Sequence, residues 1–382
     1  MIPYGKQDIS DDDINSVIEV LKSDFLTQGP IVPKFENALC SYTGASYSIA
    51  TNSATSSLHI ACLALGLGPG DILWTSPITF VASANCALYC HASVDFVDVD
   101  PSTALMSIDN LREKLENAKA IGKLPKIVVP VHFSGQSCDM QSIYDLGIEY
   151  GFSIIEDAAH AIGAYYKGQP VGNCRFSDIT VLSFHPVKII TTGEGGASLT
   201  NNKSLAHKMK MFRSHGIERV ENKNKNVTSD SWIYDQKLLG YNYRMTDISA
   251  ALGISQLKRL DYYVSKRLEI VTWYNEKISE LDLKPLQIGS NNKSSHHLYV
   301  VRLNSKSLIR GKVFDYMRES GIGVNVHYIP VYKHSYFNSD IQLIGAEEYY
   351  NSAITLPLFP HIKINELEKV VKTLHSALKH IK

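Results

Sequence analysis

The sequence predicts an α/β fold: a large domain built on a mostly parallel sheet, followed by a smaller α+β domain. Over residues 47–200, short β-branched or apolar runs alternate with helical patterns, which is typical of parallel strands joined by helices. This alternation then stops, and a long helical pattern covers 246–281. The 382 residues suffice for two domains. We expect a large domain over 1–250 and a small one over 251–382.

Seven strands and five helices are expected in the large domain. Each strand is a short apolar run bounded by turn residues, and the runs lie at 48–51, 72–75, 94–97, 127–132, 153–156, 179–184 and 197–200. The helices have apolar residues three and four positions apart and lie at 56–67, 80–89, 108–118, 140–150 and 204–212. In such a domain the ligand site lies at the carboxyl ends of the strands.

The rest of the chain mixes helices and strands. The pattern over 246–281 places apolar residues at helical spacing, namely Ile248, Ala251, Leu252, Ile254, Leu257 and Leu260. Strands are expected at 298–303 and 323–327, with helices at 312–320 and 364–379. The segment 221–230 is polar and lacks periodicity, so we expect a mobile loop.

Composition excludes several classes of protein. The 38 basic and 38 acidic residues balance, so binding of nucleic acid through overall charge is not expected. No apolar stretch approaches the ~20 residues of a membrane span, and we expect no membrane contact. The six cysteines form no CxxC pair, and scattered free thiols favour a reducing compartment, the cytoplasm. Histidines at metal-binding spacing are also missing, so we expect no metal site.

Lys188 is the first candidate catalytic residue. It follows a predicted strand and stands beside Val187, Ile189 and Ile190. Apolar surroundings disfavour the charged ammonium and lower its pKa, which provides the nucleophilic amine that a Schiff-base lysine needs. The alternative is a lysine that extends to the surface, and this is commoner for an isolated lysine.

Asp157 is the second candidate, at the carboxyl end of a predicted strand. Glu156 and Asp157 are neighbours on that strand and point to opposite faces, so they make a poor acid/base pair. A single buried carboxylate near a lysine can pair with a protonated ring nitrogen, as in pyridoxal-phosphate (PLP) enzymes. The alternative is a helix N-cap, because Asp157 precedes two alanines.

A hydroxyl-rich turn is the third candidate. Residues 51–57 read TNSATSS and lie between a predicted strand and a predicted helix. Free backbone N–H groups and the helix dipole make such a turn an anion site. A simple capping turn explains the same residues equally well.

The three candidates follow one another along the chain: a turn suited to phosphate, an aspartate after a strand, and a lysine after a later strand. This order resembles that of the fold-type I PLP enzymes. The chain is similar to the sugar aminotransferases of the DegT/DnrJ/StrS family. The matching segments span most of the chain: 26–29, 53–56, 68–71, 79–82, 156–160, 183–196, 212–216 and 240–244. The resemblance implies a large, mostly parallel α/β/α domain with a small C-terminal α+β domain.

The resemblance also implies roles at the cofactor ring. Lys188 corresponds to the lysine that forms the Schiff base with PLP and later moves protons. Asp157 corresponds to the partner of the pyridinium nitrogen, and Phe80 to the aromatic residue that stacks on the ring. His160 stands where many relatives have Gln, near the phenolic oxygen of the cofactor.

Further matches concern the phosphate, the partner subunit and the sugar. Ala54, Thr55 and Ser183 match phosphate-binding positions; Ala54 replaces the usual Gly, so only its backbone N–H is implied. Asn242 matches a residue that reaches the phosphate from the partner subunit, which implies a homodimer with shared active sites. Positions matching regions that contact the nucleotide sugar are Tyr4, Asp24, Phe25, Leu26, Thr27, Arg244, Val326, His327, Tyr328 and Ile329.

The reaction implied is transfer of an amino group from L-glutamate to C4 of a UDP-4-keto-6-deoxy-N-acetylhexosamine. The product would be UDP-4-amino-4,6-dideoxy-N-acetyl-β-L-altrosamine, which belongs to pseudaminic acid biosynthesis. Two alternatives stay open: a 3- or 4-aminotransferase for another nucleotide-linked keto-sugar, and a non-catalytic sensor with the same fold. Related sugar 3-dehydratases carry His in place of the Schiff-base lysine, and Lys188 argues against that activity.

Overall fold

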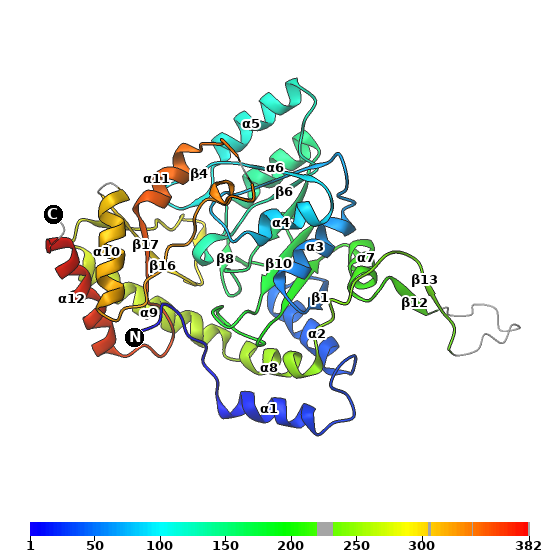
Figure 1. The fold of residues 1–382 in the computed structure, drawn as a ribbon. Helices are drawn as coiled ribbons and strands as arrows, with labels where there is room; N and C mark the ends of the chain where they lie inside the picture. The colour runs from blue at the N-terminus through cyan, green and yellow to red at the C-terminus, as the bar shows by residue number, and fades with distance from the viewer. Residues whose placement is uncertain (220–231, 305–306, 338, 381–382) are drawn as a thin grey trace, which may run out of the picture.

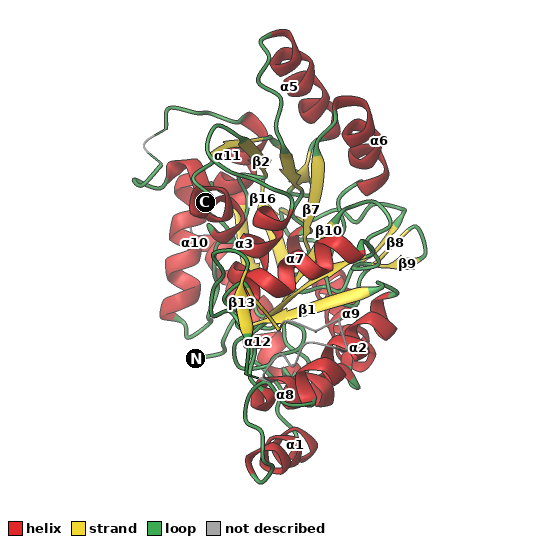
Figure 2. Ribbon diagram, turned by 90° about the vertical axis from the view of Figure 1, so that its right-hand side faces the viewer, coloured by secondary structure: helices red, strands yellow, loops and turns green. Residues whose placement is uncertain are grey.

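The computed structural model describes residues 1–219, 232–304, 307–337 and 339–380. The loop expected at 221–230 lies outside the described residues. Figures 1 and 2 present the chain in two views related by a 90° rotation.

A seven-stranded sheet organises the first part of the chain. Its strand order is β1-β11-β10-β7-β6-β2-β3. The bounds are β1 Tyr47–Thr51, β2 Ile72–Thr75, β3 Ser93–Phe96, β6 Ile127–Val129, β7 Ser153–Asp157, β10 Ile179–Ser183 and β11 Gly196–Thr200. Neighbouring strands from β10 to β3 pair in parallel, whereas β11 is antiparallel to both β1 and β10. The predicted mostly parallel sheet is confirmed.

Helices cover both faces of this sheet, because successive strand residues point to opposite sides. Val129 and Ile155 pack in one hydrophobic cluster with residues of α3 (Ala54–Ala64), α4 (Ala82–Tyr89) and α7 (Lys203–Arg213). Val128 and Ile154, one position earlier, pack in another cluster with α5 (Ile108–Ala120) and α6 (Met140–Tyr150). The three-layer arrangement follows directly from this alternation (Figure 2).

A second core lies towards the C-terminus. The strands β14 (Leu283–Pro285), β16 (Tyr299–Leu303) and β17 (Ala353–Leu356) form a sheet that packs with α9 (Leu260–Ile278), α10 (Ser307–Glu319) and α12 (Ile364–His380). Apart from Ile2, the buried residues of this cluster come from 270–377. The N-terminus therefore lies among C-terminal elements (Figure 1).

Two predictions for this region need correction. The helix expected over 246–281 is two helices, α8 (Asp247–Leu257) and α9, with the break at Lys258 and Arg259. The strand expected at 323–327 is wrong: Asn325 forms only an isolated bridge to Thr355. The domain boundary near residue 250 stays a prediction; α8, which spans it, packs against α1 (Asp11–Leu21) and α2 (Ile31–Thr43).

The remaining elements are short. They are β4 Val99–Asp100, β5 Leu105–Met106, η1 Phe133–Gly135, β8 Tyr165–Tyr166, β9 Gln169–Pro170, β12 Ile217–Arg219, β13 Tyr234–Gln236, β15 Asn292–Lys293, η2 Val331–Lys333 and α11 Ile344–Ser352. Among the helices of the described ranges, none has the length and apolar character needed to cross a membrane.

Candidate active site

Lys188 lies in the loop between β10 and β11, at the carboxyl end of the parallel strands. Ile189 and Ile190 beside it are buried. Burial lowers the pKa of the Lys188 amine to about 8, although the nearby charge of Asp157 acts in the opposite direction. The Lys188 side chain is half-buried and not extended into solvent, and its role as the Schiff-base lysine stays a prediction.

Asp157 is the last residue of β7 and is buried. Its Oδ2 accepts a hydrogen bond of 2.6 Å from the Ser83 hydroxyl, and its Oδ1 accepts one of 3.1 Å from the Ala159 backbone N–H. Turn residues follow it in place of a helix, so the N-cap alternative is wrong. Ser83 stands 74 residues earlier, on α4, and no local sequence pattern connects it to Asp157.

Glu156 points to the opposite face of the strand, as predicted. Its carboxylate accepts hydrogen bonds from Ser177 Oγ (2.5 Å) and Thr180 Oγ1 (2.9 Å), and lies 2.6 Å from His132 Nε2. His132 Nε2 donates its proton to this carboxylate, and the hydrogen bonds and charge of Glu156 raise the pKa of His132 to about 10 despite its burial. These donors, together with the charge of His132, lower the pKa of Glu156 despite its burial. The network holds the strand end that carries Asp157.

We expect Glu156→Gln to lower the free energy of unfolding by about 1.5–3 kcal/mol, because hydrogen bonds to a buried charged acceptor are lost. The pKa of Glu156 lies below 4.5 in the folded protein, so this contribution is present at neutral pH and disappears as the pH falls. Denaturant unfolding of the cofactor-free protein at pH 7 and pH 4 measures both effects. Glu149→Gln, at an exposed side chain, is the control; equal losses in the two variants would contradict the account.

The turn at 51–57 caps α3 and leaves backbone donors free. The Ser53 hydroxyl accepts the Ser56 backbone N–H, so the capping alternative is correct for Ser53. Among the described residues, however, no partner is found for the Ala54 and Thr55 backbone N–H groups at the helix N-terminus. A Cβ on Gly196 would lie 2.5 Å from the Ala54 nitrogen. The first residue of β11 can therefore lie this close to the turn only because it is a glycine. An anion can bind at these N–H groups, near Ser183 at the end of β10.

Phe80 and His160 form the aromatic part of the site. The Phe80 side chain is 60% exposed, and its ring centroid lies 6.4 Å from that of Tyr328. An apolar ring left open beside a buried site is suited to stacking on a planar ligand. His160 is buried, and its ring centroid lies 4.4 Å from that of His297. His297 was not among the predicted site residues.

Tyr4 and residues 326–329 join this group. The Tyr4 ring lies 5.2 Å from the His327 ring, and His327 Nδ1 lies 2.9 Å from Thr355 Oγ1. Burial and then the charge of Lys188 lower the pKa of His327 to about 3, which indicates that the segment faces the lysine. Val326 is half-buried and Ile329 is exposed.

The other predicted sugar contacts lie in the segment 24–27 and at Arg244. The segment from Asp24 to Thr27 has Phe25 and Leu26 exposed, and Thr27 bridges Thr246. Arg244 bridges Thr51 of β1. Asn242 has an exposed side chain and bridges Ser214. Within the described part of the chain, Asn242 forms no hydrogen bond or bridge with Lys188, Asp157 or His160.

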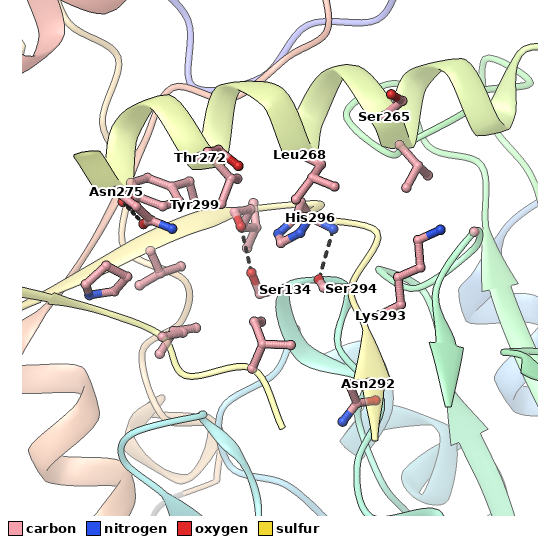
Figure 3. A pocket seen from close by; sticks show the side chains of 18 of the residues that line it. Ser134, Ser265, Leu268, Thr272, Asn275, Asn292, Lys293, Ser294, His296 and Tyr299 are labelled. Carbon is pink, nitrogen blue, oxygen red and sulfur yellow. Dashed lines mark hydrogen bonds between the residues drawn. The ribbon is translucent and has the colours of Figure 1, made fainter. Parts of the chain in front are cut away.

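A cavity of about 600 Å³ lies beside this site, under α9. Figure 3 shows its hydroxyl and amide side chains, among them Ser134, Thr272, Asn275 and Asn292. Lys188 and Asp157 do not line it. Ser134 belongs to both regions, because its side chain lines the cavity while its backbone N–H donates to His160.

These residues fit pyridoxal 5′-phosphate. The fold provides a nucleophilic amine, a buried carboxylate, an open aromatic ring and free N–H donors at a helix N-terminus, all at the carboxyl ends of one sheet. The fold and the site define the class of fold-type I PLP-dependent aminotransferases.

The chain belongs to the DegT/DnrJ/EryC1/StrS aminotransferase family, whose model matches residues 7–375. It is 38% identical to the UDP-4-amino-4,6-dideoxy-N-acetyl-β-L-altrosamine transaminase of Campylobacter jejuni, covering all of this chain and 99% of the relative. Among solved structures, Helicobacter pylori PseC, an aminotransferase involved in the biosynthesis of pseudaminic acid, matches with a TM-score of 0.90 and 30% identity over 99% of both chains.

A putative sugar aminotransferase from Streptococcus pneumoniae, Spr1654, matches in its PMP form with a TM-score of 0.91 and 28% identity over the whole of both chains. Its PLP form matches with a TM-score of 0.89 over all of this chain and 99% of that chain. The cofactor of this family is pyridoxal 5′-phosphate.

Proposed function

We propose that this enzyme transfers the amino group of L-glutamate to C4 of a UDP-4-keto-6-deoxy-N-acetylhexosamine, forming UDP-4-amino-4,6-dideoxy-N-acetyl-β-L-altrosamine for pseudaminic acid biosynthesis. The observation that carries the proposal is the desolvated Lys188 amine beside the buried Asp157 carboxylate, in a chain similar along its whole length to an altrosamine transaminase.

Different residues of this chain would hold different parts of the cofactor. Ala54 and Thr55 donate backbone N–H groups to the phosphate, and Ser183 adds a hydroxyl. Asp157 would accept a hydrogen bond from the protonated ring nitrogen and so keep that nitrogen protonated, and Phe80 would cover one face of the ring. When bound, the cofactor supplies an electron sink and a carrier for the amino group. Lys188 removes and returns protons at the reacting carbon.

The pH dependence of Lys188 gives a direct check. Only the neutral amine is nucleophilic, and its pKa is about 8. The rate at which the cofactor-free protein captures PLP should therefore rise about tenfold per pH unit below pH 8 and level off above it. Stopped-flow absorbance measures this rate. A constant rate between pH 6 and pH 9 would mean that another group reacts.

Contacts to the nucleotide sugar are assigned to Tyr4, Arg244 and the segments 24–27 and 326–329. Support comes from the exposure of Phe25 and Leu26. The Tyr4 ring also lies 5.2 Å from that of His327, whose pKa is lowered by burial and by the charge of Lys188. Transfer to C3, or to another nucleotide-linked keto-sugar, is the second candidate, since these contacts do not by themselves define the sugar's stereochemistry.

We propose a homodimer whose active sites are shared. Exposed apolar side chains gather on α1 and the following segment (Ile14, Ile18, Leu21, Phe25, Leu26) and around β13 (Trp232, Ile233, Tyr234, Leu239). The hairpin β12–β13 extends away from the sheet domain (Figure 1). Such patches favour a protein interface, and the exposed Asn242 is suited to reach a partner's phosphate site.

A mixing experiment tests the shared site. Lys188→Ala and Asn242→Ala homodimers should each be almost inactive, because one lacks the nucleophile and the other a partner contact. Unfolded and refolded together, they form mixed dimers in which one of the two sites is intact. We expect mixtures to regain up to about a quarter of wild-type activity, as random pairing makes half the dimers mixed. Mixtures as inactive as the separate variants would contradict a shared site.

We place the enzyme in the cytoplasm. All six cysteines are free thiols, and five of them are buried, which suits a reducing compartment.

Product analysis tests the reaction. The PLP-loaded protein is incubated with L-glutamate and the UDP-4-keto-6-deoxy sugar, and NMR identifies the carbon that gains nitrogen. An amino group at C4 with the altro configuration is expected. Amination at C3, or turnover only with a different keto-sugar, would replace the proposed substrate. Binding of PLP without any transfer would favour the sensor alternative.

A further inference from the structure

Ser134 is held in an unusual conformation beside His160. Its φ of 59° lies in the left-handed region, which non-glycine residues adopt rarely and mainly where neighbouring contacts require it. Its hydroxyl donates to the Leu298 carbonyl at 2.8 Å, and its own carbonyl accepts the His297 backbone N–H at 2.9 Å. These two contacts orient the Ser134 backbone N–H, which donates to His160 Nδ1 at 3.3 Å.

This hydrogen bond determines which nitrogen of His160 carries the proton. A backbone N–H can only donate, so Nδ1 must offer its lone pair. The other neutral tautomer and the imidazolium both carry a proton on Nδ1. In either form, two donors, the Nδ1–H and the Ser134 N–H, would point at each other. The single proton is therefore on Nε2. Burial, followed by the charges of Lys188 and His327, also lowers the pKa of His160.

The proton on Nε2 in turn orients the Tyr328 hydroxyl. Tyr328 Oη lies 3.3 Å from His160 Nε2, and because Nε2 donates, Oη accepts. The phenolic proton must then point elsewhere, and within the described part of the chain no acceptor for it is found. Burial raises the pKa of Tyr328, so the hydroxyl keeps its proton. Its ring lies beside Phe80 and Phe133.

We propose that Ser134 and His160 form a directed hydrogen-bond chain that leaves the Tyr328 hydroxyl as a donor to an acceptor oxygen of the bound ligand. That oxygen is either the phenolic oxygen of the cofactor or an oxygen of the keto-sugar. Ser134 and His160 are positioning residues in this chain, and Tyr328 touches the ligand. The identity of the ligand rests on the proposed function, whereas the protonation of His160 does not.

Neutron diffraction from deuterium-exchanged crystals of the PLP-loaded protein tests the chain directly. We expect deuterium on His160 Nε2 and none on Nδ1, with the Tyr328 deuterium directed away from His160. Deuterium on Nδ1, or on both nitrogens, overturns the proposal, as does a Tyr328 deuterium directed at Nε2. If the expected pattern is found but L-glutamate yields no 2-oxoglutarate, the proposed reaction fails and the hydrogen-bond chain stands.

Substitutions test the same chain in solution. The amide nitrogen of Gln can occupy the position of imidazole Nε2, and that of Asn the position of Nδ1. In the absorption maximum of the PLP-loaded protein and the dissociation constant of the UDP-sugar, we therefore expect His160→Gln to keep the wild-type values and His160→Asn to change as Tyr328→Phe does. Tyr332→Phe is the control, since the Tyr332 hydroxyl bonds to Glu347 at 2.9 Å away from the ligand. Thermal unfolding confirms that each variant is folded.

Two readouts distinguish the acceptor oxygens. If the acceptor belongs to the cofactor, Tyr328→Phe shifts the absorption maximum of the PLP-loaded protein before any sugar is added. If it belongs to the sugar, the spectrum is unchanged and the dissociation constant of the UDP-sugar rises about tenfold, as expected for one lost hydrogen bond. No change in either measurement, or a Gln variant that resembles Tyr328→Phe while the Asn variant resembles wild type, overturns the proposal.

Discussion

Lys188→Ala is expected to abolish transamination, with kcat falling by at least about a thousandfold. Lys188 lies in the loop after β10, and the pKa of its amine, about 8, leaves a substantial neutral fraction near physiological pH. Without it, the protein loses both the covalent attachment of the cofactor and the base that moves protons at the reacting carbon. Coupled measurement of 2-oxoglutarate checks the loss.

Borohydride reduction provides a readout independent of turnover. In the wild-type protein, reduction in the presence of PLP should add the cofactor mass to the peptide that carries Lys188, and in Lys188→Ala it should add none. Lys203→Ala, at an exposed lysine at the start of α7, is the matched control and should label and turn over normally. Normal turnover by Lys188→Ala would contradict the role of Lys188 as the Schiff-base lysine.

Asp157→Asn is expected to lower kcat by about 10²–10³-fold in a folded protein. The amide has nearly the same shape and can still accept the Ser83 hydroxyl, but it carries no charge to keep the ring nitrogen protonated. The substitution therefore removes the negative charge that stabilises the protonated ring, but it keeps the packing of the side chain.

The variant should also bind PLP more weakly, which equilibrium fluorescence titration measures. Asp109→Asn, at an exposed position in the first turn of α5, is the control. An Asp157→Asn enzyme with unchanged kcat and PLP affinity would show that this carboxylate only organises the turn at Ala159.

Much of the sheet domain could be predicted because its strands carry strong local signals. The runs at 72–75 and 140–150 coincide with β2 and α6, where apolar periodicity and flanking turn residues agree. The strand expected at 323–327 failed because its apolar residues are buried by the C-terminal sheet and α10 without being paired as a strand. Tertiary packing determines the conformation of that segment, and the local sequence pattern does not indicate such packing.

Without the family resemblance, the candidate site could be predicted only where a residue's chemistry is evident beside its own strand. Lys188 and Asp157 each follow a strand and stand among apolar or small residues, so position and environment could be inferred together. Ser83, Ser134 and His297 act through partners far away in the chain, and no periodicity encodes such pairs. Ser134 is clearest: its left-handed backbone and its bond to His160 arise from the packing of η1 against the segment that precedes β16.

L-glutamate alone, without any sugar present, should leave its amino group on the cofactor of this enzyme. The direct measurement loads the purified protein with PLP, removes excess cofactor, adds L-glutamate alone and quantifies 2-oxoglutarate by rapid quenching. We expect a burst of about one 2-oxoglutarate per subunit, followed by no further turnover until the keto-sugar is added. A protein that binds PLP at Lys188 and forms no 2-oxoglutarate would contradict this expectation.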